Sequence, residues 1–170
     1  LLGFVLLEIY HAPSYIVVHC AIDDWIPFTE AFIIPYLLWF PYLLGGVALL
    51  LILSIRHREA KKDFSRLGFY LICGLTICLA AYVIWPSTLT LRPNPYPRDN
   101  IFIDLCRLIQ GIDSPTNVCP SMHVYTSCVM LYCIWGCGYI RTSFSRRTAG
   151  LLRYGSLVLT FFIVLSTMFV

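Results

Sequence analysis

AFIIPYLLWFPYLLGGVALLLILSI, residues 31–55, is the stretch that decides what kind of protein this chain is. It contains no charged residue, and about 20 apolar residues are enough for an α-helix to cross the hydrocarbon core of a bilayer. Pro35, Pro41 and the pair Gly45–Gly46 would weaken a helix in water. Within a membrane they are tolerated, because neighbouring helices satisfy the freed backbone groups. The stretch therefore predicts a kinked, closely packed transmembrane helix.

The composition of the whole chain agrees with a membrane location. Hydrophobic residues make up 59% of the 170 residues and charged residues 12%, whereas soluble domains contain roughly 45–50% and 25%. The net charge of +3 would favour an anionic partner. The basic residues lie beside apolar stretches, however, where they face lipid headgroups. We therefore exclude nucleic acid as a partner and expect membrane lipids instead.

Apolar blocks separated by short charged segments divide the rest of the chain. They predict transmembrane helices over residues 67–85, 121–140 and 151–170, and part of an earlier one over residues 1–10. The chain starts and stops inside apolar runs, so we expect a single integral membrane domain over residues 1–170 that is truncated at both ends. The predicted fold class is all-α, a multi-pass transmembrane helix bundle.

The distribution of Lys and Arg predicts the orientation of the bundle, because basic loops stay on the cytoplasmic side. Basic residues crowd the loop after the first full span and the loop between the last two: Arg56, Arg58, Lys61, Lys62 and Arg66, then Arg141, Arg146, Arg147 and Arg153. Segments 11–30 and 86–120 have no such excess. Those two segments are predicted to lie on the extracytoplasmic face of a cell membrane.

The cysteines indicate neither a metal site nor a disulfide framework. Five lie within apolar spans, without the spacing or histidines of a zinc site, and we interpret them as small packing residues: Cys73, Cys78, Cys128, Cys133 and Cys137. Three fall in predicted loops, where a bridge between two of them stays open: Cys20, Cys106 and Cys119. No metal site and no cofactor is predicted.

Two polar motifs bracket the long outer loop, Leu91-Arg92-Pro93 after one span and Cys119-Pro120-Ser121-Met122-His123 at the start of the next. Pro120 suits the first turn of a helix, and the free N–H groups of Ser121 and its neighbours form an anion site with the helix dipole. His123 would stand beside that anion, placed to give or take a proton. Singly, the histidine could be a hydrogen-bonded interfacial residue and Arg92-Pro93 an ordinary turn. Their placement at one membrane face favours a shared function.

From about residue 67 to its end, the chain resembles the type 2 phosphatidic acid phosphatase (PAP2) superfamily. That family carries Lys-x6-Arg-Pro, Pro-Ser-Gly-His and Ser-Arg-x5-His-x3-Asp, in this order. Arg92-Pro93 matches the end of the first motif, Pro120-Ser121-Met122-His123 matches the second, and Ser166 opens the third. Met122 in place of Gly looks more like the branch of inositol-phosphorylceramide synthase-like and sphingomyelin synthase-like phosphotransferases.

The chain also departs from the family pattern. Trp85 stands where the first motif has Lys, and Thr167 stands where the third has Arg. The His of the third motif, the family's nucleophile, would fall beyond Val170. The chain as it stands is therefore expected to be inactive by itself.

The resemblance implies a six-helix membrane core and a metal-independent phosphohistidine reaction without a cofactor. It implies that His123 protonates the leaving oxygen and that Arg92 and Ser121 bind phosphate oxygens. Supporting positions would be Pro93, Pro120, Met122, Ser166 and Thr167. The substrate would be a lipid phosphate or phospholipid. Water as the acceptor gives a phosphatase, and a lipid or sugar hydroxyl gives a phosphotransferase.

The alternative is a non-enzymatic multi-pass membrane protein, such as a transporter subunit, in which Arg92 and His123 merely cap their spans. A transport pathway would be expected to place an ionisable residue deep within a span. Neither residues 31–55 nor residues 67–85 contain a charged one. The predicted function is therefore hydrolysis or phosphotransfer on a lipid phosphate at the extracytoplasmic face.

Overall fold

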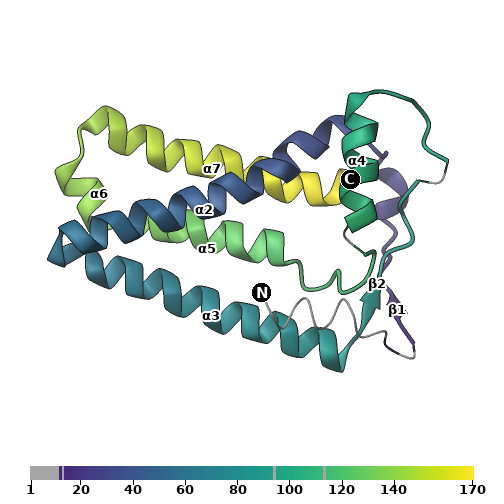
Figure 1. The fold of residues 1–170 in the computed structure, drawn as a ribbon, viewed down its shortest axis with the longest axis horizontal. Helices are drawn as coiled ribbons and strands as arrows, with labels where there is room; N and C mark the ends of the chain where they lie inside the picture. Colours follow the sequence, from purple (N-terminus) through teal and green to yellow (C-terminus); the bar gives the residue numbers. More distant parts are fainter. Residues whose placement is uncertain (1–11, 13, 94, 113) are drawn as a thin grey trace.

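The computed structural model describes residues 12, 14–93, 95–112 and 114–170, and four long helices lie alongside one another in it (Figure 1). They are α2 (Ile33–Arg56), α3 (Lys61–Ile84), α5 (Met122–Gly136) and α7 (Arg146–Phe169). Two shorter helices, α4 (Ile101–Ile112) and α6 (Gly138–Ser143), lie at opposite ends of this bundle. The span predicted over residues 1–10 lies outside the described residues.

Short elements connect the helices. Three 3-10 turns cover Asp23–Trp25, Glu30–Phe32 and Arg58–Ala60. The strands β1 (Ile16–Val17) and β2 (Ser87–Thr88) have two residues each and pair in parallel. The described chain is therefore mostly helical, which confirms the all-α prediction.

Three helical segments are long and apolar enough to cross a membrane: Glu30–Arg56, Arg58–Ile84 and Arg146–Phe169. They contain the predicted span 31–55 and most of the predicted spans 67–85 and 151–170. The second and third begin several residues earlier than predicted. Their first turns hold charged residues, which a helix accepts readily once its apolar part extends beyond them. By length and composition, three helices in the described part of the chain could thus span a membrane.

The structure divides the segment predicted as one helix over residues 121–140 into α5 and α6. α5 has 15 residues, about 22 Å of helix at 1.5 Å per residue, which is shorter than the ~30 Å hydrocarbon core. The backbone leaves the helix at Cys137, where ψ is 112°. Gly136 and Gly138 flank this break, and each glycine costs a helix about 1 kcal/mol relative to alanine.

Helix α4 was not predicted from the sequence. It lies within the segment 86–120, which was predicted to be an outer loop. Ile103 and Cys106 on this helix are fully buried, while Ile101, Leu108 and Ile112 are exposed. Cys106 is therefore a packing residue of a helix rather than a loop cysteine. Its burial raises the pKa of its thiol above the usual value.

All the cysteines are free thiols in the described part of the chain, so no bridge joins Cys20, Cys106 and Cys119. The packing interpretation holds for Cys78, Cys133 and Cys137, which are buried. Cys73 is half-buried and Cys128 is exposed.

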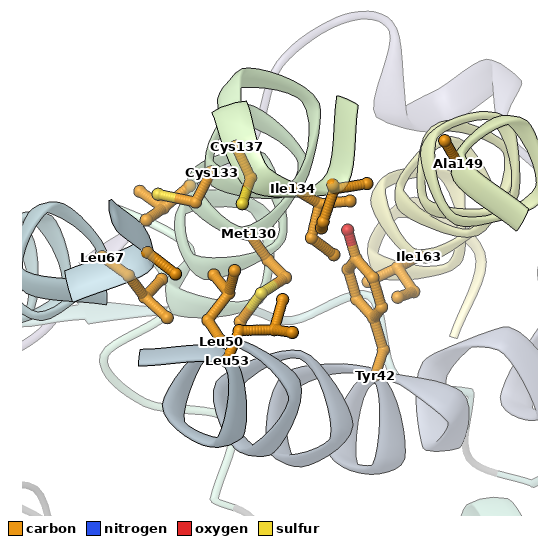
Figure 2. Close-up of a cluster of buried hydrophobic side chains, with 13 residues drawn as sticks. Tyr42, Leu50, Leu53, Leu67, Met130, Cys133, Ile134, Cys137, Ala149 and Ile163 are labelled. Atoms are coloured by element: carbon orange, nitrogen blue, oxygen red, sulfur yellow. The ribbon is translucent and has the colours of Figure 1, made fainter. Parts of the chain in front are cut away.

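The core lies where α5 packs between α2, α3 and α7 (Figure 2). Its central side chain is Met130, which is fully buried and reaches toward Leu50 and Leu53 of α2. Two glycines permit this close packing. A Cβ added at Gly46 would lie 2.3 Å from the Met130 sulfur, and one at Gly74 would lie 1.9 Å from the Tyr125 ring.

The contact between Gly74 and Tyr125 yields a test of the packing of α3 on α5. The Tyr125 hydroxyl donates to the Tyr70 carbonyl at 2.6 Å, so the ring has no free direction in which to move. Gly74→Ala should lower the free energy of unfolding by about 1–3 kcal/mol through overpacking. Thermal unfolding of the purified protein in detergent measures this loss of stability.

Gly68→Ala is the matched control on the same helix, because a Cβ there meets nothing within 4 Å. It should leave the stability unchanged or raise it by up to about 1 kcal/mol. Equal stability of the two variants would contradict the packing described here.

Candidate functional site

All three sequence motifs lie at one end of the bundle, where α4 and the strands also lie (Figure 1). Arg92 follows β2, Ser121 and His123 open α5, and Ser166 lies in the last turn of α7. The end of α7 is fixed to the segment before α2. The Thr29 N–H donates to the Phe169 carbonyl at 3.1 Å. The Phe169 ring stacks on the Phe32 ring, with centroids 4.4 Å apart.

The segment before α5 is anchored to the end of α3 and to β2. The Tyr82 hydroxyl donates to the Pro120 carbonyl at 2.6 Å. The buried Ser87 accepts twice: its carbonyl from the Asn117 N–H at 2.6 Å and its hydroxyl from the Cys119 N–H at 3.2 Å. The Cys119–Pro120 peptide bond is cis. The hydrogen bonds of Tyr82 and Ser87 set the position at which α5 begins.

Ser121 caps α5, because its Oγ accepts from the Val124 N–H at 3.4 Å. Met122 is the first helical residue, so Pro120 precedes the cap instead of occupying the first turn as predicted. The predicted helix opening at Ser121 is confirmed. Since the cap takes up the Val124 N–H, an anion here would meet the N–H groups that precede it.

The imidazole of His123 packs against two aromatic rings of α2. Its centroid lies 4.6 Å from that of Tyr36 and 4.2 Å from that of Trp39. The Trp39 indole is itself fixed, since its Nε1–H donates to Thr126 Oγ1 at 2.9 Å. His123 Nε2 is buried and has no hydrogen-bond partner among the described residues.

Arg92 is held by the carbonyl end of α4. Its Nη1 lies 3.4 Å from the Gln110 carbonyl oxygen and its Nη2 lies 3.4 Å from that of Ser114. Both distances exceed the ~2.7–2.9 Å of strong charge-assisted bonds. The Tyr96 hydroxyl donates to the side-chain Oε1 of Gln110. Burial raises the pKa of this tyrosine. Its hydroxyl therefore stays protonated at neutral pH.

Residues 87–89, before the first motif, pair in antiparallel fashion with residues 115–117, before the second. The Leu89 N–H donates to the Pro115 carbonyl at 2.9 Å, and Thr88 bridges to Thr116. The register puts Ser87 opposite Asn117, and beyond the paired residues the Arg92 side chain reaches the Ser114 carbonyl at the other end. Arg92 and the start of α5 are thus at different ends of the paired stretch. Arg92 bonds to carbonyls at the end of α4 and His123 packs on α2, so these contacts do not bring the two side chains together.

The third-motif hydroxyls are occupied by their own helix. Ser166 is fully buried and donates to the Ile163 carbonyl at 2.6 Å. Thr167 donates to the Val164 carbonyl at 2.8 Å. Neither hydroxyl reaches the other two motifs through these bonds.

Sequence reasoning missed the charged group that joins this end of the bundle to α2. Glu30 is buried, and its Oε1 accepts from Arg98 Nη1 at 3.0 Å and from Asn100 Nδ2 at 3.1 Å. It also missed that Tyr36 and Trp39 pack on His123. Their spacing of three residues, which puts both on one helix face, was the available signal.

Among the described residues, no group of three or more His, Cys, Asp or Glu side chains could hold a metal ion. No family model, no curated protein and no solved structure matches the chain.

Proposed function

We propose that the protein is a PAP2-type lipid phosphatase or lipid phosphotransferase, acting on phosphate esters at the extracytoplasmic face of a cell membrane. The proposal rests on the resemblance of the motifs and on their gathering at one end of the bundle. At that end a serine-capped helix opens with its histidine in the first turn. A helix start of this kind attracts anions, and an imidazole beside it supplies a proton.

The orientation follows from the opposite end of the bundle. The basic turn between α2 and α3 and the basic turn before α7 both lie there, together with α6 (Figure 1). The two turns touch, because Tyr139 Oη and His57 Nε2 share a hydrogen bond of 2.8 Å. Basic segments stay in the cytoplasm, so the motif-bearing end would face outward in a multi-pass arrangement.

The reaction in this proposal has two steps. In the reaction that the resemblance implies, the family's third-motif histidine attacks phosphorus, the bond to the leaving oxygen breaks, and His123 gives that oxygen its proton. His123 then takes a proton from water or an acceptor hydroxyl, whose oxygen attacks phosphorus as the phosphorus–nitrogen bond breaks. Arg92 and the Ser121 N–H group stabilise the negative oxygens.

Arg92 would exchange its present partners for phosphate in this reaction. Two of its contacts, to the Gln110 and Ser114 carbonyl oxygens, are long, at 3.4 Å each. A phosphate oxygen offers a full negative charge and a shorter, stronger bond to a guanidinium. Binding would therefore draw Arg92 away from the end of α4 and toward the start of α5.

The substrate's hydrocarbon would lie along an open apolar groove between α2 and α7. The groove has a volume of about 620 Å³ and is lined by Pro35, Leu38, Tyr154, Gly155, Val158, Leu159 and Phe162. Both helices are long and apolar enough to span a membrane, so the medium around this groove would itself be lipid. An acyl chain fits such a surface without loss of hydrogen bonds.

Two substitutions in the full-length protein test the catalytic roles. His123→Ala should lower turnover of a lipid phosphate by about 10²–10⁴ while substrate binding changes little, because only proton donation is lost. Arg92→Ala should weaken both binding and turnover, because its charge meets phosphate in the ground state as well. Release of phosphate, or transfer to a lipid acceptor, measures both in detergent, with and without a metal chelator.

Two exposed residues of the outer segments serve as controls. His19 is paired with Asp24 at the surface, and Arg107 is paired with Asp99 and Asp104. Alanine at His19 or Arg107 should leave turnover within about twofold of the parent, since surface ion pairs contribute little. Unchanged activity in His123→Ala, or activity abolished by the chelator alone, would overturn the proposed mechanism.

Thiol labelling of intact cells tests the orientation. Cysteine introduced at the exposed Asp99 should react with a membrane-impermeant maleimide, whereas cysteine at Lys62 or Arg147 should react only after the cells are permeabilised. The labels are counted above those that the native thiols of the parent take up. The reverse pattern would turn the motif-bearing end toward the cytoplasm and defeat the proposal.

A further inference from the structure

Two buried polar atoms on α5 have no hydrogen-bond partner among the described residues: His123 Nε2 and Ser127 Oγ. Ser127 is only 1% exposed. A buried donor or acceptor left without a partner costs about 1–3 kcal/mol, and helices surrounded by hydrocarbon have no bulk water to offset this. Two such atoms on one helix need a common explanation.

The neighbouring polar side chains have hydrogen-bond partners, so these two unpaired atoms are the exception among them. Trp39 Nε1 donates to Thr126 Oγ1 at 2.9 Å, and Thr126 Oγ1 donates to the Met122 carbonyl at 2.7 Å. The hydroxyls of Tyr42 and Thr160 are bonded at 3.0 Å. The unsatisfied pair is therefore a local feature of one face of α5 and not a sign of loose packing.

The spacing of the pair suits one bridging molecule. Residues four apart in a helix lie on the same face, with Cβ atoms about 5–6 Å apart. A water molecule with two hydrogen bonds of about 2.8 Å joins two atoms roughly 4–5 Å apart, a separation that two side chains on one helix face can adopt. Both atoms are buried in the bundle: His123 packs on the aromatic rings of α2, and Ser127 is 1% exposed.

We propose that a buried water molecule bridges His123 Nε2 and Ser127 Oγ, and that Ser127 is thereby a positioning residue for His123. The Nε2–H donates to the water, and the water donates to Ser127 Oγ. The Ser127 hydroxyl can in turn donate to the carbonyl one turn earlier on the helix. Nδ1 is then the ring nitrogen that exchanges protons with a substrate, because the bond at one nitrogen fixes the state of the other.

The catalytic part of this inference rests on the proposed function, whereas the water site does not. In the reaction, a lipid phosphate bound as its monoanion gives its proton to Nδ1, and this proton then moves to the leaving oxygen. The neutral ring that remains keeps its proton on Nε2, bonded to the water. No other bond changes at His123 in that step.

Nitrogen-15 NMR of the protein in lipid nanodiscs tests the water site without any turnover. The chain has four histidines, and the signals missing from a His123→Ala sample identify those of His123. The parent should show His123 as the Nε2–H tautomer, with magnetisation transfer from water to that proton. Ser127→Ala should reduce the transfer and shift the tautomer ratio toward Nδ1–H, and Ser127→Thr should restore both.

The signals of His57 serve as an internal control, because its Nε2 is bonded to Tyr139 far from Ser127. They should be the same in all samples. A His123 spectrum unaffected by Ser127→Ala, or a parent with Nε2 unprotonated, would overturn the inference. The first result would mean that Ser127 bonds only to its own helix.

Kinetics then separates this inference from the proposed function. In a full-length protein that hydrolyses lipid phosphate, Ser127→Ala should lower kcat about tenfold, the effect of one ordinary hydrogen bond, with KM unchanged. Ser127→Thr should recover most of this loss. If kcat is unaffected by Ser127→Ala, the positioning role is refuted even where the water is present. An inactive parent with the NMR signature intact would instead count against the proposed function alone.

Discussion

The hydrogen bonds from Ser87 and Tyr82 to the segment before α5 are the constraint on which the rest of the site depends. They join the end of α3 to the start of α5 across a connection that would otherwise leave both ends free. Because α5 is the helix that packs against α2, α3 and α7, the point at which it starts decides which of its residues face inward. His123 meets the rings of α2 for this reason.

The interior of the bundle combines apolar packing with a line of polar groups along α5. Met130 and its aliphatic neighbours fill the half of the core near the basic turns (Figure 2). Toward the motif-bearing end the interior holds the Trp39 indole and the hydroxyls of Thr126, Tyr42 and Thr160, each bonded to a neighbour. In a low-dielectric surrounding such bonds are strong and unpaired groups are costly. A polar histidine can therefore be stable there only with its nitrogens accounted for.

The long helices could be predicted from the sequence because each contains an uninterrupted apolar run. The helix α4 was missed, although its apolar and polar residues alternate with the period of an amphipathic helix whose inner face holds the buried Ile103 and Cys106. The break at Cys137 depends on two flanking glycines, whose effect in a long apolar segment cannot be judged from composition. The capping role of Ser121 was predictable from local chemistry.

The surroundings of the site residues lay beyond sequence reasoning, because they join residues far apart in the chain. The contact of His123 with Tyr36 and Trp39 bridges more than 80 positions, and Glu30 meets Arg98 across 68. Arg92 shows that residues expected to meet can also be separated by contacts that the sequence does not reveal. Its motif suggested a place beside His123, whereas the pairing of residues 87–89 with 115–117 leads the chain away from α5, and the Arg92 side chain bonds to the end of α4.

A structure of the full-length protein with bound vanadate, a stand-in for the phosphoryl group, tests the central claim most directly. The account predicts the anion at the start of α5, with Arg92 Nη atoms moved onto its oxygens at about 2.7–2.9 Å and His123 beside it. Vanadate bound elsewhere, with Arg92 still on the Gln110 and Ser114 carbonyls, would contradict a phosphate site at this end of the bundle.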